Sequence, residues 1–233
     1  MQAVILAAGL GARLGDLKCG LPKGFLHIDE LGESLIVRSL RFLKEAGIRE
    51  IIIGTGFESS AYEKLALSLS EPNFHIKTHK NDKFASTGSA YTLHCVRECI
   101  TQDFLLLESD LLYEKGALQA LLDDRRKDLI LASHATYSGD EVFMCVKEGK
   151  LQDLSKDRSK LDSIDCELVG ISKLSLQTFR TLDCLRENDY EYLLRGFEVL
   201  LPHSLVWCEI DCAEHLERAK RLVIPKLPKI HTS

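Results

Sequence analysis

The sequence predicts an α/β protein with a Rossmann-like, mostly parallel sheet and helices on both faces. Through residue 134, short apolar runs alternate with longer segments of helical period, an alternation typical of βαβ units. Strands are expected at 2–7, 50–55, 73–78, 103–108 and 128–134, and helices at 33–46, 59–70, 88–99 and 114–124.

The helix expected at 33–46 shows the pattern most clearly. Leu35, Ile36, Leu40 and Leu43 recur on one side of it, as in a helix that buries one stripe against a core. Gly47 follows, at the position where glycine commonly ends a helix. The first half of the chain therefore predicts strands covered by amphipathic helices.

The pattern changes after Thr136. The stretch "EVFMCVKEGKLQDLSKD" predicts two short strands around a Glu148–Gly149 turn, and so a small inserted β-hairpin region. A strand at 164–172, two helical stretches, a last strand at 206–211 and a helix in "AEHLERAKRLV" complete the expected order. We assign 1–223 to a single domain and 224–233 to a tail or the start of a linker to a further domain.

Composition excludes several classes of function. The chain has a net charge of -5 and no Lys/Arg run longer than residues 125–127, which argues against a nucleic-acid partner or direct membrane insertion. No signal-peptide pattern and no apolar stretch of about 18 residues occurs, so we expect a cytoplasmic protein. The 8 cysteines are scattered without a C-x-x-C pair, and we expect core packing rather than a zinc site.

The glycine-rich stretch "LAAGLGARLGDLKCGLPKGFL" follows the first strand. Its first glycines resemble a dinucleotide-binding fingerprint, but Gly15, Gly20 and Pro22 interrupt the helix that such a fingerprint requires. An extended glycine loop instead lets backbone N–H groups approach phosphate oxygens. Arg13 adds a fork that bridges two oxygens, and Lys23 adds a mobile point charge. We therefore expect a triphosphate-binding loop.

L-A-A-G-x-G-x-R, followed by the Pro22–Lys23 pair, resembles the signature of the sugar-phosphate nucleotidyltransferase superfamily. The resemblance covers about residues 1–223 and is closest to the small cytidylyltransferases that act on phosphocholine and 2-aminoethylphosphonate. Where hexose-1-phosphate enzymes often carry Pro-Leu-Thr, "LGDLKCGL" stands instead. The resemblance implies a nucleotide-diphospho-sugar transferase-like fold and transfer of CMP from CTP to a small phosphonate or phosphate acceptor, with Mg²⁺.

The resemblance also assigns residues to roles. Lys23 and Arg13 are expected to be catalytic, and Asp110 and Asp211 to hold Mg²⁺ with Glu209 near the same ion. The full set expected to bind nucleotide is Leu6, Ala7, Ala8, Gly9, Gly11, Ala12, Arg13, Lys23, Ser86, Thr87, Gly88, Ser89 and Asp110.

The sequence itself supports the carboxylates. Asp110 follows the carboxyl end of an apolar strand, where open α/β sheets bind ligands. Glu209 and Asp211 flank one residue on a strand and so share a face. A helix N-cap is the alternative for Asp211 and for Ser86 or Thr87.

The acceptor is expected to contact the second half of the chain. Lys156, preferred over Arg158, would bind the phosphonate or phosphate. Carboxylates suit a primary amine, and the candidates are Asp140, Glu141 and Glu191, with Tyr190 beside them. Other acids near these positions are Glu187 and Asp189.

Two acceptor substrates and one other class of function remain open. Choline favours aromatic cages, but Trp207 is the only tryptophan, so 2-aminoethylphosphonate is preferred to phosphocholine. A noncatalytic nucleotide-binding regulatory module is the alternative of another class, although it would be expected to lose the lysine or the metal carboxylates. A transaminase, fused or separate, is an expected partner of an aminoethylphosphonate enzyme.

Overall fold

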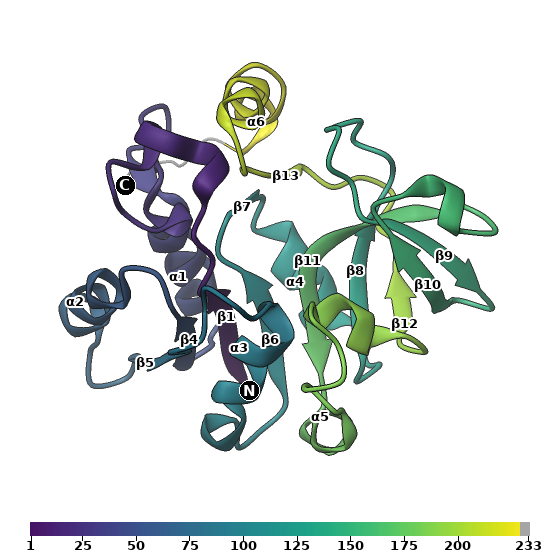
Figure 1. Cartoon of the computed structure of the whole chain (residues 1–233), viewed down its shortest axis with the longest axis horizontal. Helices are drawn as coiled ribbons and strands as arrows, with labels where there is room; N and C mark the ends of the chain where they lie inside the picture. Colours follow the sequence, from purple (N-terminus) through teal and green to yellow (C-terminus); the bar gives the residue numbers. More distant parts are fainter. Residues whose placement is uncertain (229–233) are drawn as a thin grey trace.

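The strands form a nine-stranded sheet and two small two-stranded sheets. The structure is a computed structural model that describes residues 1–228, the side chains of Asp16 and Lys18 excepted (Figure 1). The large sheet contains β1 (Gln2–Ala7), β4 (Glu50–Thr55), β5 (His75–Lys80), β6 (Phe104–Glu108), β8 (Leu129–Ser133), β9 (Phe143–Lys147), β10 (Lys150–Ser155), β11 (Cys166–Leu174) and β12 (Glu198–Leu200). The small sheets pair β2 (His27–Ile28) with β3 (Glu33–Ser34), and β7 (Leu111–Tyr113) with β13 (Trp207–Glu209).

The large sheet has the order β5-β4-β1-β6-β11-β8-β12-β10-β9. The first four strands are parallel, whereas β11 lies antiparallel between β6 and β8. Strand β9 pairs with both β10 and β11, so the last five strands close into a ring. The Rossmann-like class and the inserted hairpin are confirmed, but the sheet is mixed rather than mostly parallel.

The hairpin accounts for part of this difference. Glu148 and Gly149 connect β9 to β10 with φ of 52° and 76°, as the tight turns that join antiparallel strands require. A connection this short leaves no room for the helix that a parallel crossover needs.

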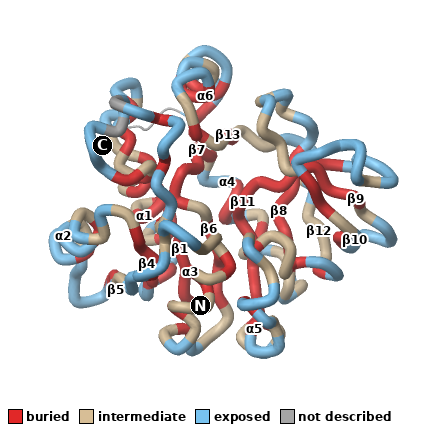
Figure 2. The backbone as a smooth tube through the Cα atoms, viewed as in Figure 1, coloured by how far each residue is buried: buried red, intermediate tan, exposed pale blue. Residues whose placement is uncertain are grey.

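Helices cover both faces of the parallel strands. They are α1 (Leu35–Glu45), α2 (Ser59–Leu69), α3 (Ser89–Cys95), α4 (Gly116–Asp123), α5 (Leu176–Thr181) and α6 (Ala213–Arg218). Alternate side chains of a strand face opposite ways: Ile5 and Leu107 pack in the cluster with α1, α2 and α4, while Val4 and Leu106 pack with α3 and α5. The central strands are accordingly buried along their length (Figure 2).

Some boundaries differ from those expected. Helix α1 begins at Leu35 because the two preceding residues pair with β2. The two helical stretches expected after β11 are short: α5 has 6 residues, and Tyr190–Leu194 is a 3-10 segment. No helix within residues 1–228 is long and apolar enough to cross a membrane.

The end of the described chain packs onto the domain. Ile224–Lys226 forms a 3-10 turn, and Leu227 is buried in an apolar cluster with Leu14 and Leu216. The boundary expected at residue 223 stays a prediction, and residues 229–233 of the expected tail lie outside the described residues. All 8 cysteines are free, and Cys145, Cys166, Cys184 and Cys208 are buried.

Candidate active site

A cavity of about 320 Å³ opens at the carboxyl ends of β1 and β6, the edge at which parallel α/β sheets bind ligands. Its walls include most of the predicted nucleotide-binding residues: Leu6, Ala7, Ala8, Gly9, Arg13, Lys23, Thr87, Gly88, Ser89 and Asp110. Predicted residues from four separate parts of the sequence therefore surround one space.

Three predicted nucleotide-binding residues do not line this cavity. A Cβ at Gly11 would lie 2.5 Å from Cγ of Lys23, so this glycine makes room for the lysine side chain. Ala12 is exposed. Ser86 donates a hydrogen bond from its hydroxyl to the Lys83 carbonyl at 3.2 Å.

The segment before α3 leaves space for backbone rather than for a side-chain cap. Helix α3 has Gly88 as its N-cap and no side-chain cap hydrogen bond, so neither Ser86 nor Thr87 caps it. A Cβ at Gly88 would lie 2.1 Å from the Asn188 carbonyl oxygen. The Ser89 hydroxyl accepts a hydrogen bond from the Tyr190 backbone N–H at 2.9 Å. Gly88 thus lets the 188–191 segment reach the cavity.

Lys23 lies between two aspartates. Its Nζ donates to Asp110 Oδ2 at 2.9 Å and also to Asp211 Oδ1. Burial opposes the charge of Lys23, but the carboxylates of Asp110, Glu209 and Glu108 together outweigh it, so the pKa of the ammonium lies above its usual value. Arg13 donates to the other oxygen of Asp211 at 2.5 Å. Helix α6 has Cys212 as its N-cap. Asp211 therefore pairs with Lys23 and Arg13 and does not cap the helix.

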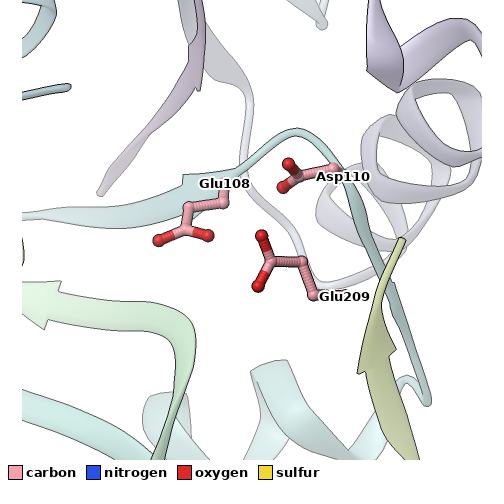
Figure 3. A group of neighbouring side chains, drawn as sticks. All are labelled: Glu108, Asp110 and Glu209. Carbon is pink, nitrogen blue, oxygen red and sulfur yellow. The ribbon is translucent and has the colours of Figure 1, made fainter. Parts of the chain in front are cut away.

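Three carboxylates meet beside this lysine. Oxygens of Glu108, Asp110 and Glu209 lie within 4.8 Å of one another and point toward a common space (Figure 3). Burial and the neighbouring carboxylates raise the pKa of Glu108, and the same causes raise the pKa of Glu209 to about 7. Oδ1 of Asp110 is buried without a hydrogen-bond partner. This group offers the hard oxygen ligands that Mg²⁺ prefers.

The carboxylate group differs from the predicted metal set of Asp110, Asp211 and Glu209. Glu108 belongs to this group, whereas the oxygens of Asp211 face Lys23 and Arg13 beside it. Glu108 was not predicted as a metal ligand, although it precedes Asp110 by two residues, the same spacing that singled out Glu209 and Asp211. Other wall residues without a predicted role are Tyr62, Phe84, Thr92, Ser109 and Val142.

Three predicted acceptor residues, Lys156, Tyr190 and Glu191, line the cavity. The Tyr190 hydroxyl donates to Glu108 Oε1 at 2.7 Å. Burial, followed by the nearby Asp189 carboxylate, raises the pKa of Glu191 to about 7.

Asp140, predicted to bind the acceptor amine, does not line the main cavity and is paired with two cations. Its two oxygens accept from Arg13 at 2.8 Å and from Lys156 at 2.9 Å. Glu141 lies outside the main cavity, in the wall of a smaller neighbouring chamber. Arg158 stacks over the ring of Phe143, 5.0 Å from its centroid.

The fold and this cavity define a nucleotidyltransferase. Residues 3–222 match the family of MobA-like NTP transferase domains, and the chain belongs to that family. The resemblance to the nucleotidyltransferase superfamily is thereby confirmed.

Particular relatives fall into several acceptor classes. A bifunctional IPC transferase and DIPP synthase of Thermococcus kodakarensis is 27% identical over 96% of the chain, but the chain spans only 50% of that protein. CTP:phosphoglutamine cytidylyltransferase of Campylobacter jejuni is 24% identical, with 93% of this chain and 98% of the relative covered. CMP-5'-(3-aminopropyl)phosphonate synthase of Streptomyces rubellomurinus is 27% identical over 71% of the chain and 26% of its own length.

A solved structure shows the same fold. The inositol-1-phosphate CTP transferase from T. maritima superimposes with a TM-score of 0.80 at 18% identity, covering 97% of this chain and 95% of that one. The nucleotide-diphospho-sugar transferase-like architecture is thus confirmed.

Proposed function

We propose that this protein is a cytidylyltransferase that transfers CMP from CTP to 2-aminoethylphosphonate, releases pyrophosphate and forms CMP-2-aminoethylphosphonate for phosphonate decoration of lipid or glycan. The observation that carries the proposal is the position of the Lys23 ammonium between Asp110 and Asp211 in the cavity wall. Relatives named for CTP-dependent transfer to phosphoglutamine and for an aminopropylphosphonate product support this choice of nucleotide and acceptor.

The reaction needs positioned charge rather than a general base. A phosphonate oxygen, already anionic near neutral pH, attacks the α-phosphorus of CTP in line, and the bond to the leaving pyrophosphate breaks. Lys23 and Arg13 stabilise the negative charge that develops on the transferring group. The cavity holds the two anions in reacting geometry, which converts a bimolecular step into an effectively unimolecular one.

The residues present fit a divalent ion, which nucleotidyltransferases of this family commonly use. Asp110 has one buried oxygen without a partner. The carboxylates of Asp110 and Asp211 converge on one point, the Lys23 ammonium. We propose that Asp110 and Asp211 hold Mg²⁺ with Glu209 near it. The ion would neutralise the triphosphate as it meets the acceptor.

Lys156 is proposed to bind the anionic end of the acceptor, because it lines the cavity and its side chain is 53% exposed. Phosphocholine is the alternative acceptor. A transaminase, fused or separate, and a cytoplasmic location remain parts of the proposal. A noncatalytic regulatory module is the alternative of another class, and the assay below distinguishes it by the absence of product.

A pyrophosphate-release screen tests the function. Each of the four nucleoside triphosphates is combined with 2-aminoethylphosphonate or phosphocholine in the presence of Mg²⁺. We expect release with CTP and 2-aminoethylphosphonate, at a kcat/KM at least about 100-fold above that for phosphocholine, equivalent to roughly 2.7 kcal/mol. A preference for phosphocholine would overturn the acceptor, and the absence of release in every combination would favour a regulatory module.

A further inference from the structure

A second, smaller chamber adjoins the main cavity. It encloses about 30 Å³ and shares Glu108, Val142 and Glu209 with the main cavity. Its other walls include Glu141, Glu167, Trp207 and His215. We call this space the acidic chamber, since four glutamates line it.

The chamber has neither lysine nor arginine in its lining. Arg13 and Lys156 reach its edge only at Asp140, a further wall residue whose two oxygens they occupy, and burial lowers the pKa of the His215 imidazole. Glu167 is only 2% exposed, and its carboxylate accepts from the Thr136 backbone N–H at 2.9 Å and from the Ser133 hydroxyl at 3.4 Å. Both of these donors are neutral. Buried carboxylates without a counter-charge are costly, so the chamber suits a cationic ligand.

The backbone is shaped to admit the Glu108 side chain. Strand β11 has a register shift between Leu168 and Ser172, and Gly170 within it has a φ of +82°. A Cβ at Gly170 would lie 3.0 Å from the Glu108 carboxyl carbon. The Tyr190 hydroxyl holds one oxygen of the same carboxylate. The strand irregularity and the tyrosine together hold Glu108 at the boundary between the two cavities.

An unpartnered oxygen also faces this boundary. Asp110 is only 8% exposed, and its Oδ1 has no hydrogen-bond partner among the described residues. Its carboxylate points toward Glu108 and Glu209 (Figure 3). Asp110 lines the main cavity and not the acidic chamber, so this oxygen is left to the metal proposed above.

From this geometry we propose that the acidic chamber binds the primary ammonium group of the acceptor substrate. The N–H groups of this ammonium would donate hydrogen bonds to the carboxylates of Glu108 and Glu167. This inference rests on the proposed cytidylyltransferase function and assigns its acceptor class: a small phosphonate or phosphate whose other end is a primary amine. A primary ammonium has three N–H donors for carboxylates, and Trp207 adds an aromatic wall that favours a cation.

The size of the chamber supports the primary amine. A water molecule needs roughly 10–15 Å³ by this measure, so a space of about 30 Å³ holds about two waters. An ammonium group fits such a space. The chamber disfavours choline because a trimethylammonium group has no N–H donors for the carboxylates.

The test compares two acceptors that differ by one amino group, 2-aminoethylphosphonate and ethylphosphonate, at saturating CTP. The variants are Glu108→Gln and Glu167→Gln, with Glu148→Gln in the exposed β9–β10 turn as the control of equal charge change. We expect wild type to prefer 2-aminoethylphosphonate by at least 100-fold in kcat/KM. Each chamber variant should reduce this preference at least 10-fold, mainly through KM for 2-aminoethylphosphonate, and Glu148→Gln should leave it unchanged.

Tyr190→Phe provides a second variant if Glu167→Gln does not fold, because it removes only the hydroxyl that positions Glu108. It should also reduce the preference. Pyrophosphate release with an unaltered preference in all of the chamber variants would overturn this inference alone. Equal losses with both acceptors would assign Glu108 to the metal or the phosphates and would also overturn it. No release from CTP by wild type with either acceptor would overturn the proposed function first.

Discussion

Gly11 lies directly against Lys23: a Cβ at position 11 would be 2.5 Å from Cγ of the lysine. Lys23 in turn reaches the carboxylates of Asp110 and Asp211. The glycine loop therefore does more than offer backbone to a phosphate, because one of its glycines determines where the lysine lies.

Gly11→Ala should displace the Lys23 side chain and lower kcat/KM. Gly15→Ala is the matched control: both glycines have a left-handed φ, 58° and 51°, but a Cβ at Gly15 would meet nothing within 4 Å. Backbone strain at Gly15 is at least substantial, because φ 51° with ψ -128° is a conformation adopted mainly by glycine. We expect Gly11→Ala to lose at least 10-fold more kcat/KM per folded molecule than Gly15→Ala. Equal losses would show that Gly11 acts through backbone strain alone.

Asp211→Asn should abolish turnover, since it removes the carboxylate shared by Lys23 and Arg13. Asp110→Asn should do the same, and both should raise the Mg²⁺ concentration required and weaken Mn²⁺ binding measured by titration. Asp29→Asn is the control, because the Asp29 side chain is 89% exposed and lies outside the cavity wall. A large fall in Tm for Asp211→Asn with unchanged activity per folded molecule would contradict a role in the site.

Stability should fall as pH rises because of Glu191. Its pKa is raised to about 7 in the folded protein, by burial and then by Asp189, against about 4.3 when unfolded. The folded state therefore binds the proton more tightly, and the stabilisation present below the unfolded pKa is lost as pH rises through about 7. Relative to Glu191→Gln, wild type should lose on the order of 1–3 kcal/mol of unfolding free energy between pH 4 and pH 8.

Urea unfolding at several pH values measures this difference. Glu63→Gln on the exposed side of α2 changes the net charge equally and serves as the control. If the unfolding free energies of wild type and Glu191→Gln change in parallel with pH, the pKa of Glu191 is the same in the folded and unfolded protein.

Local patterns were sufficient for much of the fold. The alternation of apolar strands and amphipathic helices predicts β1, β4 and β6 because these strands are buried on both faces and read as continuous apolar runs. The antiparallel position of β11 between β6 and β8 has no local signal, since register between distant strands depends on tertiary pairing.

The candidate site, like the fold, was predicted only in part. Motif residues such as Lys23 and Asp110 were predicted and do lie together in the cavity wall. The ion pairs of Asp140 could not be predicted, because its partners Arg13 and Lys156 lie 127 and 16 residues away in the sequence. The acidic chamber likewise needs Glu108 and Glu167 from different strands, which only the folded sheet brings together.

Lys23→Ala tests the central claim, that Lys23 in the glycine loop drives cytidylyl transfer, most directly. The measurement is the formation of CMP-2-aminoethylphosphonate from CTP, followed by ³¹P NMR, with Lys64→Ala on the exposed side of α2 as the control. We predict a loss of at least 100-fold in turnover for Lys23→Ala, on the order of 3 kcal/mol of transition-state stabilisation, with circular dichroism that shows an intact fold and with Lys64→Ala unaffected. A folded Lys23→Ala protein that forms product at the wild-type rate would contradict the account.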